Sequence, residues 1–156
     1  MIRLTFTGDI LIEPEQKEAI CSHSDGFDTI FRNILSSFSL SNYIIGNLET
    51  PLAGEELVYS SHKWSFNTPD CLAESLKKAG FNLLTTANNH CLDRGKIGLL
   101  NTLKTLDRYG LEHIGTYAQK SDKEKIFIKD IGGLRFAFLS YTYGTNASLN
   151  GEYLGE

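Results

Sequence analysis

The stretch TPDCLAESLKKAGFNLLTTANNH, residues 68–90, joins a helix pattern directly to a strand pattern. Thr68 is predicted to cap the helix, with Pro69 as its first residue, and Gly80 ends it. Residues 81–86 are rich in β-forming side chains and predict a strand, which the polar run ANNH closes. This helix-strand unit predicts a layered α/β fold. The helix face expected to be buried consists of Leu72, Ala73, Leu76 and Ala79.

Strand and helix patterns continue on the N-terminal side of this unit. Residues 2–7 alternate apolar and polar side chains and predict a strand, which Gly8-Asp9 ends. The apolar spacing over residues 26–40 predicts one helix, and residues 43–45 predict a second strand, closed by the run GNLETP. Residues 53–67 have no clean period, so we expect a long loop there.

On the C-terminal side of this unit, one more helix and strand are predicted, followed by a hairpin. Residues 97–109 predict a helix that ends at Gly110, and a short strand is expected near His113-Ile114. Residues 125–131 and 134–141 flank two glycines and predict a β-hairpin. The chain is therefore predicted to be an α/β layered sandwich with a mainly parallel sheet, followed by a C-terminal β-hairpin, in a single domain.

Composition and charge exclude several classes of protein. The 15 basic and 19 acidic side chains give a net charge of −4, which excludes a broad positive surface for nucleic acid. No apolar run approaches the ~18–20 residues of a membrane helix, and the apolar start is too short for a signal peptide. Cys21, Cys71 and Cys91 are widely spaced and predict free thiols in a reducing compartment. The chain as it stands is expected in the cytoplasm, or at the cell envelope if an export signal has been removed.

The first three predicted strands all end in polar residues that can bind a metal ion. Asp9 follows the first strand, Glu49 the second, and Asn88-Asn89-His90 the third. Because ligands gather at the carboxyl ends of parallel strands, we expect these residues to share one edge of the sheet. Carboxylate and amide oxygens with an imidazole suit manganese, iron, magnesium or zinc. Taken alone, each of these residues also fits a turn or a solvated loop.

Residues around the third strand offer supporting roles. Asp93 lies three positions after His90, so it is expected to accept the second ring N–H of His90 or to cap the next helix, and the two roles are compatible. Trp64 is interpreted as a packing residue rather than as a stacking platform. Three cations are candidates for attracting an anionic substrate, although each also fits a solvated surface: Arg94, Lys96 and Lys63.

Several of these segments form a combined motif. Its parts are Gly8-Asp9, NLETPL at 47–52, Phe66 to Pro69, and ANNHCLDRG at 87–95, followed by Gly98-Leu99 and Thr102-Leu103. In combination they resemble the CapA family of poly-γ-glutamate capsule biosynthesis proteins. The match runs over nearly the whole chain, and ANNH-x-x-D-x-G at a strand-to-helix junction is its most specific part.

That family resembles the calcineurin-like metallophosphoesterases, which are four-layered α/β sandwiches where two metal ions activate a hydroxide for attack on a phosphate ester. The resemblance implies that Asp9 and Asn89 bind metal, and that His90 binds metal or acts as the general acid. Either Asn47 or Glu49 corresponds to the bridging aspartate, and Glu49 is favoured because the bridging position calls for negative charge.

The chain also departs from the phosphoesterase pattern. Leu11 stands where phosphoesterases carry a histidine, two residues after the first aspartate. The histidine motifs that complete their site have no counterpart, because the last histidine of the chain is His113. Residues 1–156 are therefore predicted to be the N-terminal part of a larger CapA-type domain.

The expected function is a role in poly-γ-glutamate capsule or cell-envelope polymer synthesis, with a metal-dependent hydrolase site in which His90 and Asp93 are catalytic. The substrate would be an anionic polymer or a small phosphoester or peptide, and the partners other capsule-synthesis proteins. The alternative is a non-catalytic module that binds the polymer or a synthase. A third hypothesis is an incomplete sandwich that forms homo-oligomers to cover an apolar sheet face.

Overall fold

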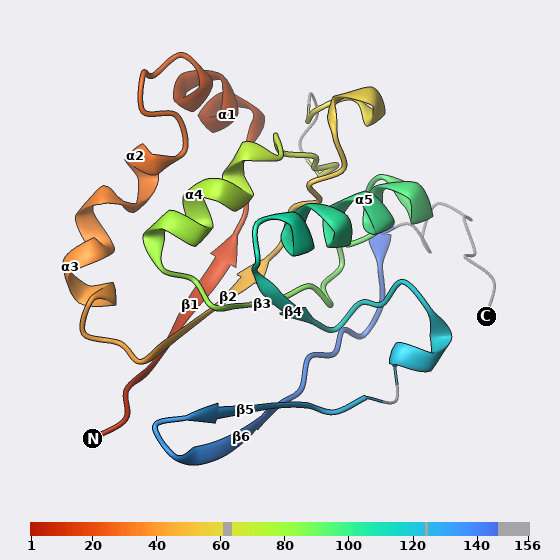
Figure 1. The fold of residues 1–156 in the computed structure, drawn as a ribbon. Coiled ribbons are helices and arrows are strands. Elements are labelled where there is room, and N and C mark those ends of the chain that lie inside the picture. Colours follow the sequence, from red (N-terminus) through yellow and green to blue (C-terminus); the bar gives the residue numbers. More distant parts are fainter. Residues whose placement is uncertain (61–63, 124, 147–156) are drawn as a thin grey trace.

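The chain lays its first strands side by side, in sequence order, in one parallel sheet. The computed structural model describes residues 1–60, 64–123 and 125–146 (Figure 1). The sheet has the order β1-β2-β3-β4, and each neighbouring pair is parallel. The predicted α/β fold with a parallel sheet is confirmed. The strands are β1 (Leu4–Ile10), β2 (Tyr43–Leu48), β3 (Leu83–Thr85) and β4 (Glu112–Ile114).

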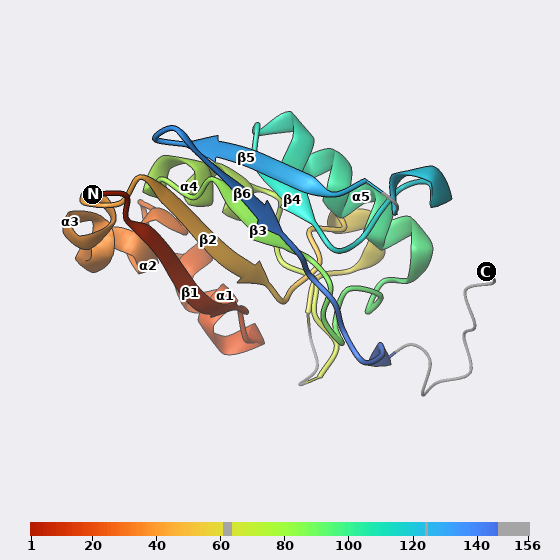
Figure 2. The same cartoon turned by 90° about the horizontal axis from the view of Figure 1, so that it is seen from below.

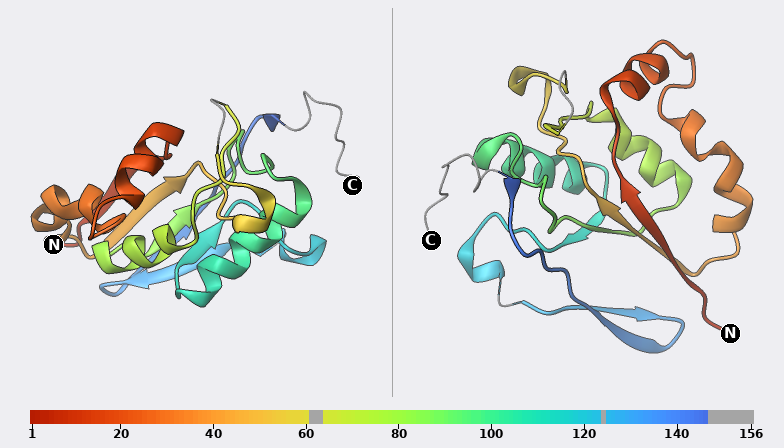
Figure 3. Two further views of the ribbon diagram at one scale, coloured as in Figure 1. Left: turned by 90° about the horizontal axis from the view of Figure 1, so that it is seen from above. Right: turned by 180° about the vertical axis from the view of Figure 1, so that it is seen from behind.

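The helices gather on one face of this sheet (Figures 1 and 3). Crossovers between parallel strands are right-handed, so a sheet that grows in one direction places all of them on the same side. The helices are α1 (Pro14–Cys21), α2 (Asp28–Phe31), α3 (Leu35–Phe38), α4 (Cys71–Ala79) and α5 (Gly95–Arg108). Short 3-10 turns are η1 (Arg32–Ile34), η2 (Glu55–Leu57) and η3 (Lys120–Asp122).

A hairpin covers the other face of the sheet. It consists of β5 (Phe127–Ile131) and β6 (Leu134–Phe138), which are antiparallel, as predicted. Seen from below, the hairpin lies over the sheet (Figure 2). Leu84 packs in the core on the helix side, whereas its neighbour Leu83 packs with Tyr43 and the hairpin phenylalanines. The described chain therefore has three layers, with the parallel sheet in the middle.

The region before β2 differs from its prediction. The single helix expected over residues 26–40 is divided into α2, η1 and α3. The 3-10 turn lets Phe31 and Phe38 both reach the core, while Ile34 and Leu35 between them stay partly exposed. Helix α1 was not predicted because it buries none of its side chains and so carries no apolar period.

Helix α4, in the 68–90 stretch, begins later than predicted. Helix α4 starts at Cys71, with Asp70 at the N-cap position, rather than with Thr68 as cap. The Thr68 hydroxyl is instead paired with that of Thr50, at 2.8 Å. Gly80 ends the helix as predicted, in the left-handed conformation with φ 101°.

Two further predictions concern cysteines and membranes. Cys21, Cys71 and Cys91 are all free thiols, as expected. None of the helices in the described part of the chain is both long enough and apolar enough to cross a bilayer.

Leu84→Ala should lower the free energy of unfolding by about 2–5 kcal/mol, because Leu84 is fully buried between the sheet and the helix layer. The matched control is Leu134→Ala at the hairpin turn, where the side chain is 57% exposed. Leu134→Ala should lower the free energy of unfolding by less than about 1 kcal/mol. Urea denaturation of both variants measures the difference, and equal costs would contradict the assigned core.

Candidate functional site

Polar side chains of three neighbouring strands meet at the carboxyl ends of the sheet. The strand register pairs Asp9 with Asn47, and Asn47 with Thr85, so the three residues form one row across β1, β2 and β3. Glu49 follows β2 directly, and the 88–90 segment begins three residues after the last residue of β3. The prediction that these strand ends share one edge of the sheet is confirmed.

Asp9 reaches this row through an irregularity in β1. The strand does not end at Gly8-Asp9, as predicted, but continues to Ile10. Between Phe6 and Asp9 the register shifts, so that β1 uses one residue more than β2. Because of the extra residue, the Asp9 side chain lies on the same face of the sheet as that of Asn47. The Ile10 side chain lies on the opposite face, in the core beneath the helices. This bulge therefore aims the Asp9 carboxylate.

Asn47 links the two carboxylates. Its Nδ2 donates to Asp9 Oδ1 at 2.8 Å and to Glu49 Oε2 at 3.0 Å. Its Oδ1 accepts from Thr85 Oγ1 at 3.2 Å and from Asn88 Nδ2 at 3.3 Å. Asn47 thus holds Asp9 and Glu49 close together, and it presents donors to both of them.

The pKa of Glu49 is raised above its ordinary value. Burial is the largest cause, because it disfavours the charged form, and the neighbouring Asp9 carboxylate adds to the rise. His90 opposes the rise through its positive field. The two carboxylates therefore form a site of excess negative charge that a cation would relieve.

His90 and Asp93 form a buried pair beside these carboxylates. His90 Nδ1 donates to Asp93 Oδ2 at 2.8 Å, and the two side chains are only 6% and 3% exposed. Asp93 Oδ2 also accepts the Phe66 backbone N–H at 2.8 Å, and the Phe66 ring packs edge-on against the imidazole at 4.7 Å. Asp93 therefore accepts the hydrogen bond expected from His90, and no side chain caps the start of α5.

This hydrogen bond fixes the imidazole tautomer. The Asp93 carboxylate accepts only, so the proton sits on Nδ1 and leaves Nε2 with a free lone pair. No residue in ranges 1–60, 64–123 or 125–146 forms a hydrogen bond with Nε2. His90 also lines a cavity of about 590 Å³ together with Glu49, Asn89 and Trp64. The site thus offers an imidazole nitrogen and a carboxylate to one open cavity.

The donor set suits a divalent cation, because it combines carboxylates, an amide oxygen and an imidazole. However, within the part of the chain that the structure describes, no three histidine, cysteine, aspartate or glutamate side chains converge to hold a metal ion. The structure brings the predicted residues together as two pairs, Asp9 with Glu49 and His90 with Asp93. Asn89 turns to a residue outside the predicted set, with its Nδ2 3.5 Å from Asn146 Oδ1.

The candidate cations have other roles. Arg94 donates to the backbone oxygens of Leu57 and Val58 and to Ser65 Oγ, so it holds the 53–67 loop rather than facing the cavity. Burial lowers the pKa of its guanidinium. Lys96 is exposed, and Lys63 lies outside the described residues.

Two residues of the cavity wall escaped the sequence interpretation. Trp64 is not a packing residue but is 67% exposed, and it stands on the loop that Arg94 holds. Asn146 Nδ2 lies 3.2 Å from His90 Nδ1. The backbone N–H of Asn146 donates to the backbone oxygen of Asn89 at 2.8 Å. Asn146 follows the hairpin, and no motif marks it in the sequence. The available signal was a tryptophan in residues 53–67, a segment without the apolar period that would predict burial.

Comparison with known proteins gives consistent matches. The family described as bacterial capsule synthesis protein PGA_cap matches residues 3–154. The capsule biosynthesis protein CapA of Bacillus anthracis is 28% identical over 144 residues, 90% of this chain and 34% of the relative. The PGA biosynthesis protein CapA of Bacillus subtilis (strain 168) is 28% identical, over 91% of this chain and 37% of the relative. The chain thus spans about a third of the length of these relatives.

Glu49→Gln should raise the melting temperature at neutral pH in chelator-treated buffer. The raised pKa means that folded Glu49 holds its proton at pH values where the unfolded chain has lost it, so stability falls as pH rises above about 4.5. Glu49→Gln has no carboxyl group at this position and so avoids this loss of stability. The difference in melting temperature between the variant and the wild type should therefore shrink below that pH. Differential scanning calorimetry from about pH 4 to about pH 8 measures it. A constant difference across the series would contradict the assignment.

Proposed function

The chain belongs to the bacterial capsule synthesis protein family PGA_cap, and from this premise we propose that it serves capsule or poly-γ-glutamate biosynthesis through a metal-dependent hydrolase site. One observation carries the proposal: His90, which is buried with Asp93, lines the same cavity as Glu49, the carboxyl group whose pKa is raised. A proton-transfer group and an anionic group that favours a cation therefore face one space.

In this proposal His90 is the general acid. Asp93 holds the ring through Nδ1, while the edge contact with Phe66 limits its rotation. Nε2 then faces the substrate, and once the ring has taken up a second proton there, it supplies that proton to the leaving group. Asp93 acts as a positioning residue, because it also stabilises the protonated ring that forms during the cycle.

Asp9 and Glu49, with Asn89 beside them, are the residues proposed to hold a divalent manganese, iron, zinc or magnesium ion. Such an ion supplies an activated water and neutralises charge on the substrate. The Asn47 amide donates to both carboxylates.

The proposed substrates are anionic: a γ-glutamyl polymer, or a smaller phosphoester or peptide of the same pathway. The related proteins from the two Bacillus species carry capsule and PGA biosynthesis in their names. Other capsule-synthesis proteins are the proposed partners. The cavity of about 590 Å³ is large enough for one or two residues of a polymer chain.

A non-catalytic binding module is the second candidate, and one observation favours it. The Asn47 amide already satisfies both Asp9 and Glu49, and the described residues form no three-ligand metal cluster. In that function the same cavity binds the polymer or a synthase, and no bond is broken. Metal content and turnover separate the two candidates.

His90→Ala should lower hydrolysis of β-glycerophosphate by about 10²–10⁴-fold, since its alkoxide leaving group needs the proton that the general acid supplies. Asp93→Asn should lower it by about 10–100-fold and shift the pH profile, because the ring loses its orienting partner. His23→Ala, which removes an exposed histidine that does not line the cavity, is the matched control. Turnover of His90→Ala equal to that of the wild type, with an unchanged melting temperature, would refute the assignment.

Stoichiometric manganese, iron or zinc should copurify with the wild-type chain. The carboxylates are its proposed ligands, so both Asp9→Ala and Glu49→Ala should lose it, whereas Asp122→Ala on the remote turn η3 should keep it. Elemental analysis of the purified proteins measures the content. A wild-type chain that binds neither endogenous nor added metal, yet binds poly-γ-glutamate saturably, would favour the binding module.

A further inference from the structure

The cavity of about 590 Å³ that His90 and Glu49 line, the His90 cavity, also has an aromatic residue that the proposed hydrolase chemistry does not use. Trp64 lines this cavity and is 67% exposed, although folded proteins bury most of the surface of a tryptophan. Leu11 and Phe66 line the cavity as well. The His90 cavity therefore combines exposed aromatic surface and apolar side chains with polar groups.

The backbone around Trp64 is held in an unusual conformation. Trp64 has a φ of 80°, in the left-handed region that bulky side chains rarely adopt. Arg94 donates to the Ser65 hydroxyl at 2.6 Å, and Asp93 Oδ2 accepts the Phe66 N–H at 2.8 Å. Asp93 thus holds both the imidazole and the segment that carries the tryptophan. Backbone strain that the surrounding structure maintains in this way concentrates at functional sites.

The polar groups of the His90 cavity that have unused hydrogen-bonding capacity are acceptors. Glu49 Oε1, Asn89 Oδ1 and His90 Nε2 have no hydrogen-bond partner within residues 1–60, 64–123 and 125–146. Glu13 adds a second carboxylate, and none of the described residues that line the cavity is a lysine or an arginine. A ligand that suits these groups presents several hydrogen-bond donors and carries no negative charge.

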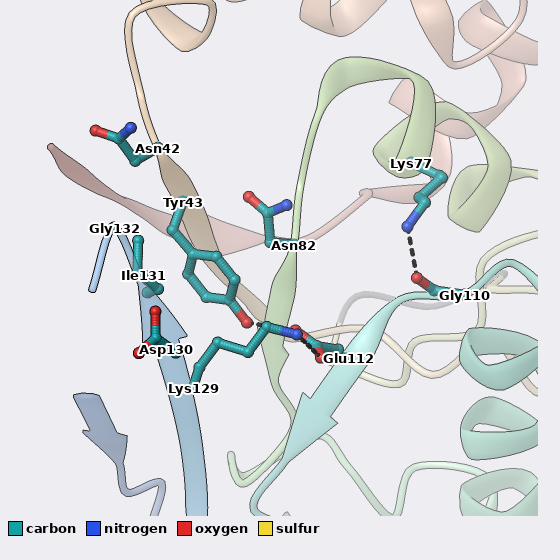
Figure 4. Close-up of a pocket in the computed structure, with 10 residues that line it drawn as sticks. All are labelled: Asn42, Tyr43, Lys77, Asn82, Gly110, Glu112, Lys129, Asp130, Ile131 and Gly132. Atoms are coloured by element: carbon teal, nitrogen blue, oxygen red, sulfur yellow. Dashed lines mark hydrogen bonds and ion pairs between the residues drawn. The ribbon is translucent and has the colours of Figure 1, made fainter. Parts of the chain in front are cut away.

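A second cavity, of about 480 Å³, lies at the amino ends of the strands and differs in both respects (Figure 4). Its aromatic residue, Tyr43, is buried, and the Tyr43 hydroxyl donates to Glu112 at 2.5 Å. Glu112 also accepts a hydrogen bond from the Lys129 ammonium, so these three polar groups satisfy one another. The second cavity therefore provides a control for binding at the His90 cavity.

We propose that the His90 cavity binds a neutral pyranose sugar ring, stacked on the indole of Trp64. One face of such a ring consists of C–H groups and packs on an aromatic side chain, while its hydroxyls project from the rim. These hydroxyls donate to the free acceptors of Glu49, Asn89 and His90. A carboxylate ligand without a cation would be repelled by Glu13 and Glu49, whereas a neutral sugar is not. Small-ligand sites measure about 300–1,000 Å³, so the cavity can hold one ring.

Fluorescence of Trp64 reports binding directly, because the chain has no other tryptophan. The full chain is titrated in chelator-treated buffer with methyl glucoside and N-acetylglucosamine, with the anionic sugar glucuronate, and with glycerol. The neutral sugars should shift the emission maximum saturably to shorter wavelength, since the stacked ring shields the indole from water. Glucuronate should bind at least about tenfold more weakly because of like-charge repulsion, and glycerol, which has no ring, should have no effect.

Variants test whether the indole carries the binding. The amide signals of Phe66 and Asn89 in the ¹⁵N-labelled chain follow binding where the tryptophan is absent. Trp64→Ala should weaken binding of methyl glucoside by about tenfold, and Trp64→Phe should restore most of it, because the ring is the stacking surface. Lys129→Gln, in the second cavity, should leave it unchanged.

Three results would overturn the proposal. Trp64→Ala with wild-type affinity and an unchanged melting temperature would exclude stacking on the indole. Glucuronate bound as tightly as methyl glucoside would indicate an anion site. Absence of any saturable response of the wild type to neutral sugars would exclude the sugar site. Because binding is measured without metal and without turnover, failure of this proposal and failure of the proposed hydrolase function are separate outcomes.

Discussion

The side-chain amide of Asn88 is buried where the ends of β2 and β3 come together, and both halves of the candidate site depend on it. Its Nδ2 donates to the Leu48 oxygen at 2.8 Å and to Asn47 Oδ1, while its Oδ1 accepts the His90 N–H at 3.1 Å. One amide thus orients Asn47 toward the carboxylates and fixes the backbone that carries the imidazole. Loss of this side chain would remove the hydrogen bonds of the Leu48 oxygen and the His90 N–H, and would leave Asn47 Oδ1 with Thr85 Oγ1 as its donor.

The sequence predicted best those elements whose apolar residues repeat and are buried. Helices α4 and α5 and strand β3 lie within a few residues of their predicted ranges, because each packs a periodic apolar face into the core. No residue of helix α1 is fully buried, so the sequence carried only the local signals of Pro14 and Gln16. The broken helix before β2 was read as one because apolar spacing alone does not distinguish buried Phe31 from half-exposed Leu35.

The order of the strands predicted more of the candidate site than the identities of its individual residues did. The rule that parallel strands place their carboxyl ends together was sufficient to predict the neighbourhood of Asp9, Glu49 and the 88–90 segment. It could not predict the bulge that aims Asp9, since a register shift depends on the neighbouring strand rather than on local pattern. Asn146 approaches His90 from 56 residues away, a contact that only the path of the hairpin brings about.

The order β1-β2-β3-β4 also bears on how the protein forms during synthesis. Each strand pairs with the strand that left the ribosome just before it, so no strand waits for a later one to fill a place between existing neighbours. The nascent sheet grows along one edge, with each crossover helix covering the same face as it emerges. The hairpin comes last and covers the second face, which makes the face behind Leu83 and Tyr43 the last part of the described core to leave water.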